Sequence, residues 1–513
     1  MLNKVQPLKT PIIAGGILLF FGLLMRMLIW FFGGKEGLVF GTSETLYSMA
    51  IQEHFFNFVY YFHSKPIGVP IRDFISMNIF GNIQIGNFVF TSILDCFATI
   101  LIYVLLIRLK TQNIFAFLLG IVWSLGLISW EYWRQSSHFD HLNVFLVSFF
   151  VWALYEQFKS PRFSRNMIAS VAGGILVLFH SMALFLVPVF LVIIQKGTIF
   201  SIKYIKTCSL VLAIPSVIIL LAAGKNLVQF GVPATSTVGG QNAMRFTSYE
   251  LPKITSFVEQ HNYPEWWLWC YNNGMEQWED PVGRYVGAVS GQCFRDRNGK
   301  YDFALLKQKL IELGEDGLTS IVQQDQIVAQ TTPWLLAGGV IESNTRFAIE
   351  YGKVSGSVWK DFLIEQPFGF IYRFARANYA HLSGVVFLGG SPYGAEYKGR
   401  SWIPRIAGFL VSPIFLFGIL ASYWIIIGSG WTLLMKRSLK FDLGISKIDK
   451  EDRQMLLIFS LLLCFFSVLT NMLTCCENNR MFMSFSPIAL LIGGYVASLL
   501  VRLFMEKGSS KRG

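Results

Sequence analysis

Long apolar stretches recur along the chain, and the polar segments between them carry most of the Lys and Arg residues. A stretch of about 17–25 apolar residues can cross a bilayer as a helix. The pattern therefore predicts an α-helical polytopic membrane protein. We expect about ten transmembrane helices, at approximately Pro11–Phe32, Asn87–Ile107, Ile114–Trp130, Asp140–Tyr155, Met167–Phe179, Met182–Ile194, Cys208–Ala223, Ile406–Ile427, Met455–Leu473 and Ile488–Leu503.

Two polar segments divide this pattern into modules. Residues 1–223 form an N-terminal transmembrane module, and its first outer loop (residues 34–81) is amphipathic and crowded with aromatic residues. Such loops favour the headgroup layer, so we expect one or two helices along the outer membrane surface. Residues 224–402 form a large extracytoplasmic loop domain with a helix around Asp302–Leu313, and residues 403–513 form a C-terminal transmembrane module.

The charge distribution sets the orientation. Of 513 residues, 53% are hydrophobic and only 14% are charged, which excludes an ordinary soluble enzyme and a disordered chain. The net charge is +12, yet the loop domain holds 16 Lys and Arg against 17 Asp and Glu, so the remainder carries +13. By the positive-inside rule both termini are cytoplasmic and the loop domain lies outside. This orientation signal accounts for the basic balance, so we expect no nucleic-acid partner. The sequence contains no Asn-x-Ser/Thr sequon, which favours a bacterial inner membrane over an endoplasmic reticulum.

The assignment of the fifth and sixth stretches decides this orientation. Each is short, and only His180 and Ser181 separate them. If the two stretches form one helix, the later topology inverts.

Cys270 and Cys293 are the two cysteines of the large outer loop. An oxidising compartment favours a disulfide between them. The alternative is two buried thiols.

Four tryptophans of the same loop stand among carboxylates, which suits either sugar stacking or contact with the lipid interface. They are Trp266, Trp267, Trp269 and Trp278.

Ionisable residues gather at the predicted outer ends of the spans. Glu44 and Lys65 belong to the first outer loop, and Arg134, His138, Asp140 and His141 lie between the third and fourth spans; Glu477 and Arg480 lie between the ninth and tenth. A carboxylate can act as a general base, and Lys or Arg can hold a phosphate. For each residue alone, a solvated span end is the simpler interpretation, but the coincidence of several favours a site. Binding of a divalent metal by His138, Asp140 and His141 is an alternative that we rank below a hydrogen-bonded site centred on Asp140.

These span ends resemble the motifs of the GT-C superfamily of membrane glycosyltransferases, in particular bacterial relatives of protein O-mannosyltransferases and of the aminoarabinose transferase that modifies lipid A. The segments Ser43-Glu44-Thr45-Leu46-Tyr47 and Lys65-Pro66-Ile67 are similar to the Asp-Glu-x-x-Tyr and Lys-Pro-Pro motifs of that family's first outer loop. The segment Phe139-Asp140-His141-Leu142 is similar to the start of the family's fourth span, which is often an Asp followed by apolar residues. The segment Glu477-Asn478-Asn479-Arg480, with Pro487 beyond, is similar to the family's late motif, a His or Glu three residues before an Arg and followed by an apolar stretch with Pro.

The resemblance implies a glycosyltransferase that moves a sugar from a polyprenyl-phosphate donor to an acceptor hydroxyl outside the membrane. The acceptor is a glycan, a lipid or a protein, and membrane lipids are further partners. Lys65 and Arg480 would hold the donor phosphate, with Arg134 as a third candidate. Ser43 replaces the family's first Asp, so we assign the base to Glu44, while Asp73 or Asp140 could hold that role instead. The supporting residues are Tyr47, Asp73, His138, His141 and Glu477.

Two other classes of function compete with this one. A transporter or flippase for lipid-linked glycans would need charges near the bilayer midplane, and the chain offers chiefly Arg26 and Asp95. A membrane scaffold without catalytic activity would only present its outer loop to partners.

Overall fold

The structure, a computed structural model, is predominantly helical. It describes residues 11–32, 44–63, 66–133, 140–179, 202–237, 251–273, 275–280, 283–288, 302–337, 344–368, 416–427, 450–473 and 485–510. Within these residues the secondary structure is helical apart from one two-stranded hairpin. The helical fold class is thus confirmed, while the number of membrane crossings stays a prediction.

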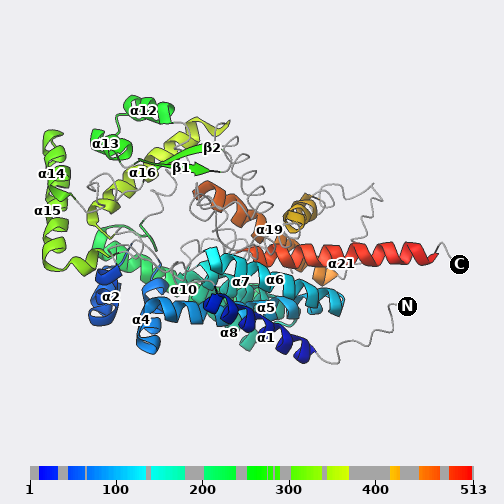
Figure 1. The fold of residues 1–513 in the computed structure, drawn as a ribbon. Helices are drawn as coiled ribbons and strands as arrows, with labels where there is room; N and C mark the ends of the chain where they lie inside the picture. The colour runs from blue at the N-terminus through cyan, green and yellow to red at the C-terminus, as the bar shows by residue number, and fades with distance from the viewer. Residues whose placement is uncertain are drawn as a thin grey trace.

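Long apolar helices form a bundle (Figure 1). Each overlaps a predicted span, whereas the sixth predicted span, Met182–Ile194, lies outside the described residues. The helices are α1 (Pro11–Phe32), α5 (Ile83–Arg108), α6 (Asn113–Trp133), α7 (Asp140–Lys159), α8 (Phe163–Phe179), α10 (Ile202–Phe230), α19 (Lys450–Leu473) and α21 (Ser486–Ser510), together with the helix Leu416–Ile427.

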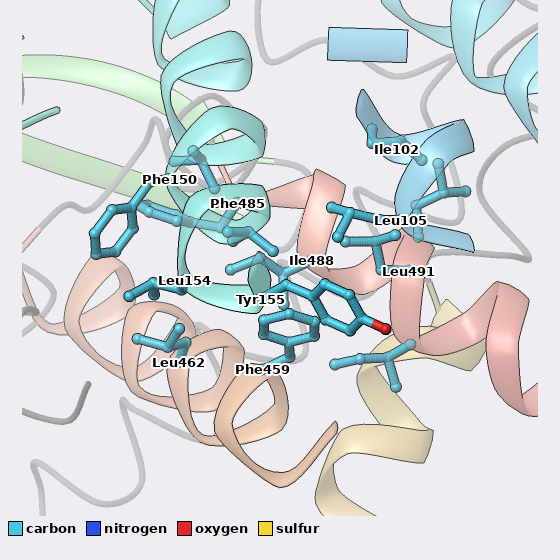
Figure 2. Packing of buried hydrophobic residues seen from close by; sticks show 14 of the residues in the cluster. Ile102, Leu105, Phe150, Leu154, Tyr155, Phe459, Leu462, Phe485, Ile488 and Leu491 are labelled. Carbon is cyan, nitrogen blue, oxygen red and sulfur yellow. The ribbon is translucent and has the colours of Figure 1, made fainter. Parts of the chain in front are cut away.

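The bundle core is built from apolar side chains that the long helices share. Figure 2 shows Leu105 of α5, Phe150 of α7, Phe459 of α19 and Ile488 of α21 packed together, and each is at most 5% exposed. Close packing of this kind supplies the dispersion contacts that hold helices together.

Apolar side chains also cover much of the outside of the bundle. Phe20 on α1 is 69% exposed, and Leu220 and Val228 on α10 are 70% and 81% exposed. Soluble monomers seldom expose apolar side chains so extensively. Two helices among the described residues, Ile85–Arg108 and Ile205–Phe230, are long and apolar enough to cross a membrane.

The first outer loop contains three helices, where the sequence predicted one or two. They are α2 (Glu44–Glu53), α3 (Phe55–Tyr61) and α4 (Gly68–Phe80). α4 ends at Gly81, whose φ of +67° lies in the left-handed region that glycine adopts readily, and the chain then turns into α5.

The large loop domain has its own hydrophobic core. Its elements are α12 (Leu251–Gln260), α13 (Glu265–Asn273), the hairpin β1 (Met275–Asp280) and β2 (Gly283–Ala288), α14 (Phe303–Glu312), α15 (Asp316–Thr331), η5 (Pro333–Leu336) and α16 (Arg346–Glu365). In the hairpin Met275 pairs with Ala288 and Asp280 with Gly283. The helix predicted around Asp302–Leu313 is confirmed as α14, and the Asp302 carboxylate caps it by accepting the N–H of Leu305.

Two of the four tryptophans are core residues rather than a binding surface. Trp267 is fully buried and Trp266 is 3% exposed, and the indole N–H of Trp267 donates to Ser355 Oγ at 2.8 Å. Neither a sugar nor lipid can reach these two rings, so both predicted uses of them are wrong. Apolar burial explains them, because they fill the space between α13 and α16.

The first outer loop and the loop domain lie at the same end of the bundle. In Figure 1, α1 begins and α21 ends at the right-hand end, while α2, α4, α14 and α15 lie toward the left-hand end. η5 packs against α2 and α3, and Trp334 joins a hydrophobic cluster with Ile51 and Phe58.

Candidate functional site

Tyr47 and Asp73 are brought together in the first outer loop. The Tyr47 hydroxyl donates a hydrogen bond of 2.6 Å to Asp73 Oδ2, which joins α2 to α4. Both side chains are buried, at 8% and 3% exposure. Burial, followed by the nearby Asp73 charge, raises the pKa of Tyr47 well above its usual value, so the phenol stays protonated and acts as a donor.

The other oxygen of Asp73 is occupied as well. Asp73 Oδ1 accepts from Arg72 Nε at 2.8 Å and from Asn87 Nδ2 at 2.8 Å, and the Arg72 guanidinium forms an ion pair with it. Ser76 Oγ donates to Asn87 Oδ1 at 2.6 Å, which fixes the orientation of the Asn87 amide. A carboxylate that already accepts from three neighbouring side chains has little free capacity to take a substrate proton. These contacts favour the supporting role of Asp73 over that of the base.

This network depends on a close approach of α4 and α5. A Cβ added at Gly86 would lie 2.5 Å from Ser76 Cβ and 2.8 Å from the Ser76 carbonyl oxygen, distances that real side chains do not reach. The Phe80 and Phe90 rings pack edge to face, 5.8 Å apart, across the same helical hairpin. Gly86 therefore lets Asn87 of α5 reach Asp73 of α4.

The start of α4 is seated on the end of α8. A Cβ added at Gly68 would lie 2.6 Å from the Leu178 carbonyl oxygen and 2.8 Å from the Phe179 ring. Gly68 follows the predicted phosphate-binding residue Lys65 by three positions. The chain that leaves Lys65 is therefore packed at once against the bundle.

The loop domain covers the first outer loop through aromatic contacts. The His54 and Trp334 rings stack, with centroids 4.1 Å apart and planes 14° apart. Trp334 is only 9% exposed, so η5 is packed into the hydrophobic cluster of the first outer loop.

His63 forms a second contact between the first outer loop and the loop domain. Its ring Nδ1 lies 2.7 Å from Thr237 Oγ1, and its backbone N–H donates to Asn344 Oδ1 at 3.4 Å. His63 is fully buried, and it stands two residues before Lys65.

Several predicted site residues lie outside what the structure describes. Glu44 and Asp140 are described in their backbone only: Glu44 is the first residue of α2, and Asp140 is the first of α7. His141 is likewise described in its backbone only. Outside the described residues lie Lys65, Arg134, His138, Glu477 and Arg480.

The predicted disulfide is untested. Cys270 is buried in the core of the loop domain, and Cys293 lies outside the described residues.

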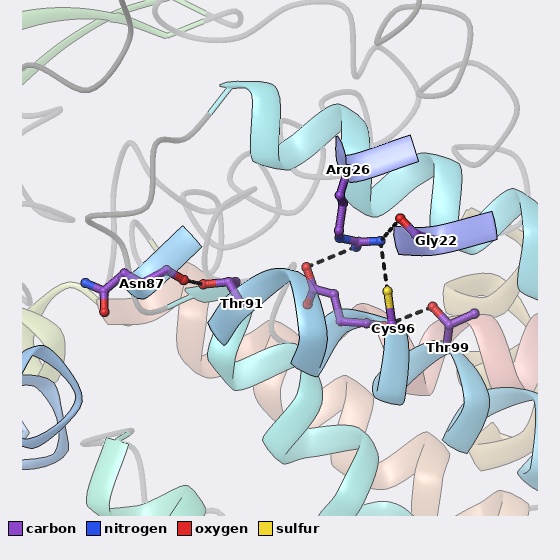
Figure 3. Close-up of polar contacts among 7 residues, drawn as sticks. Gly22, Arg26, Asn87, Thr91, Cys96 and Thr99 are labelled. Carbon is purple, nitrogen blue, oxygen red and sulfur yellow. Dashed lines mark hydrogen bonds and ion pairs between the residues drawn. The ribbon is translucent and has the colours of Figure 1, made fainter. Parts of the chain in front are cut away.

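Arg26 and Asp95 form a buried ion pair between α1 and α5 (Figure 3). Arg26 Nη2 lies 3.4 Å from Asp95 Oδ2, and the two side chains are 2% and 0% exposed. The Arg26 guanidinium also donates to the Gly22 carbonyl at 3.2 Å. These two residues are the chief charges that the sequence places near the bilayer midplane, where a transporter would need several, and the contact gives them a structural role in joining the two helices.

Within the described part of the chain, no cluster of three His, Cys, Asp or Glu residues is placed to hold a metal ion. The comparisons with known proteins add no family: no family model matches the chain, and no curated protein matches it.

Sequence reasoning missed most of the partners that hold the site. Arg72 stands next to Asp73, and Asn87 is a polar residue at the start of an apolar span; both positions were visible signals. The contacts of His63 with Thr237 and Asn344 join residues more than 170 positions apart, so nothing local in the sequence indicates them.

Proposed function

We propose that the protein is an inverting glycosyltransferase that uses a polyprenyl-phosphate-linked sugar at the outer face of a bacterial inner membrane. The acceptor hydroxyl gives its proton to Glu44 while its oxygen forms a bond to the anomeric carbon. The bond from that carbon to the phosphate oxygen breaks at the same step, and the lipid phosphate leaves with the electron pair. One displacement inverts the anomeric configuration.

Lys65 and Arg480 hold the donor phosphate in this proposal, with Arg134 as a third candidate. Their cations offset the negative charge that grows on the leaving phosphate. Asp140 is the alternative base.

The hydrogen bond between Tyr47 and Asp73 is the observation that carries the proposal. It ties the helix that begins at Glu44 to the helix that follows Lys65. A base and a phosphate-binding cation must keep a fixed separation to act on one substrate. The buried network around Asp73 supplies such a fixed frame for the two motif segments.

The arrangement of the modules also supports the proposal. Two helices of the first outer loop, α2 and α3, contact the loop domain through η5, at the end of the bundle away from the start of α1 and the end of α21. This arrangement suits a topology with both termini inside and the loop domain outside. The loop domain would cover the site and help to choose the acceptor.

The exchange Glu44→Gln tests the assigned base. It removes the proton acceptor but keeps the shape of the side chain, so transfer should fall by at least about 10²-fold. Glu53→Gln is the matched control, because Glu53 ends the same helix and its side chain is 63% exposed. Both variants should insert into the membrane like the wild type. A well-expressed Glu44→Gln protein with full activity would refute the assignment.

A further inference from the structure

His63 links three parts of the chain that are far apart in sequence. Its backbone carbonyl accepts the Thr237 N–H at 3.0 Å and the Thr237 hydroxyl at 3.3 Å, while its own N–H donates to Asn344 Oδ1. Thr237 follows α10, and Asn344 precedes α16. The first outer loop is thereby joined to the exit of α10 and to the large loop domain.

The ring of His63 takes part in the same junction. The ring Nδ1 of His63 lies 2.7 Å from Thr237 Oγ1, within hydrogen-bond distance, and the tautomer of the imidazole decides which of the two atoms donates. Burial lowers the pKa of His63 to about 3, so the imidazole is neutral at physiological pH. The Phe230 ring packs edge to face against it, with centroids 4.6 Å apart. The ring is therefore fixed by packing as well as by its hydrogen bond.

The partner segment in the loop domain is itself rigidly held. Thr345, next to Asn344, caps α16 by accepting the Ala348 N–H at 3.2 Å. The Asp325 carboxylate accepts the N–H groups of Arg346 and Phe347, each at 2.9 Å. Asn344 donates its own amide to the Ala337 carbonyl at 3.0 Å. The loop domain thus presents a fixed acceptor to the His63 backbone.

Lys225 secures the other side of the junction. This residue of α10 donates to the carbonyls of Phe62 and Val59 at the end of α3. These are carbonyl groups that the end of a helix leaves without helical partners. The segment that leads into Lys65 is therefore held by α10 on one side and by the loop domain on the other.

We infer that His63 is a positioning residue, and that its junction with Thr237 and Asn344 lets the large loop domain set the affinity for the phosphate of a lipid-linked donor. Lys65 follows His63 by two residues. Gly68, which is seated against α8, follows Lys65 by three residues. The inference rests on the proposed function of Lys65. It differs from that proposal in assigning control of the phosphate subsite to contacts made by the loop domain.

Two variants of Thr237 test the inference. Thr237→Val keeps the shape but removes the hydroxyl, so the His63 ring and carbonyl lose a partner while buried; Thr237→Ser keeps the hydroxyl. Equilibrium binding of undecaprenyl phosphate to the full chain in detergent is the readout. We expect the Kd to rise about tenfold in Thr237→Val and to stay within about twofold of the wild type in Thr237→Ser.

His261→Gln is the matched control. This partly exposed histidine of the loop domain pairs with Glu365 at 2.6 Å and takes no part in the junction. Its exchange should leave undecaprenyl phosphate binding unchanged.

Amide hydrogen exchange separates failure of the junction from failure of the proposed function. In Thr237→Val the amides of residues 63 and 237 should exchange faster than in the wild type. Unchanged exchange would overturn the junction, and faster exchange with unchanged Kd would overturn the positioning role. If the wild type binds undecaprenyl phosphate with the expected Thr237 dependence but transfers no sugar, the junction stands and the glycosyltransferase proposal fails.

Discussion

Tyr47 donates a hydrogen bond of 2.6 Å to the buried carboxylate of Asp73. This contact joins the helix that begins at Glu44 to the helix that follows Lys65. Arg72 balances the Asp73 charge, and Asn87 extends the network into α5. The first outer loop is therefore a folded part of the protein whose shape is fixed by buried polar contacts.

Removing the Tyr47 hydroxyl should weaken this frame. Tyr47→Phe leaves Asp73 Oδ2 without its donor at 3% exposure, which costs about 1–3 kcal/mol. Thermal unfolding in detergent should show a lower Tm, and donor turnover should fall with it. Tyr60→Phe is the control, since Tyr60 is 56% exposed on α3 and should change neither quantity. Equal Tm values for Tyr47→Phe and the wild type would contradict the importance of the contact.

A methyl group at Gly86 should push α4 away from α5. In Gly86→Ala the new Cβ meets Ser76 at 2.5 Å, so the two helices must separate and Asn87 must lose Asp73. Overpacking of this kind costs about 1–3 kcal/mol. Gly15→Ala is the control, because no atom lies within 4 Å of a Cβ at that position of α1. The comparison is made by Tm and folded yield; two variants of equal stability would refute the close approach.

The Arg26–Asp95 pair should behave as a structural contact. Arg26→Met leaves the Asp95 carboxylate buried without its counter-ion, which should cost about 3–5 kcal/mol. The double variant with Asp95→Leu removes both charges and should recover most of the lost stability. Measurements of Tm in detergent test both statements. Full stability of Arg26→Met alone would show that the pair does not hold α1 to α5.

Asp325 should make the loop domain less stable as the pH rises. Burial raises the pKa of Asp325 from 3.8 to about 6, and this effect exceeds the opposing effect of the two N–H groups that it accepts. Between about pH 4 and 6 the Asp325 carboxyl binds more protons in the folded state than in the unfolded state. Its contribution to the free energy of unfolding is therefore fully present below about pH 4 and is lost as the pH rises through about 6. The loss is on the order of 1–3 kcal/mol.

Asp325→Asn isolates this contribution. The Tm of the Asp325→Asn protein, measured by the fluorescence of the loop-domain tryptophans, should change less between pH 4 and 7 than the Tm of the wild type does. Parallel pH profiles of the two proteins would exclude Asp325 as the titrating group.

The sequence was sufficient for the helices but not for the contacts between them. The first predicted span agrees with α1 at both ends, because the apolar run from Pro11 to Phe32 has a single interpretation. The α14 prediction succeeded because Asp302 is a local cap. Tyr47 and Asp73 were chosen as supporting residues, and the structure brings them together.

Predictions that depended on burial could not be made from local pattern. Trp266 and Trp267 look like a binding surface beside carboxylates, yet α16 covers them and makes them core. The hairpin was missed because its strands are short and carry several charged residues. The His63 junction depends on contacts between distant segments, and one sequence holds no record of such pairing.

The consumption of a lipid-linked sugar by the purified protein is the most direct test of the central claim. Wild-type protein incubated with a radiolabelled undecaprenyl-phosphate sugar and an envelope extract as acceptor should release undecaprenyl phosphate and transfer the label in equal amounts, with the anomeric configuration inverted. Glu44→Gln should do neither. Passage of the intact donor across a vesicle membrane without cleavage of the sugar–phosphate bond would contradict the account and identify a transporter instead.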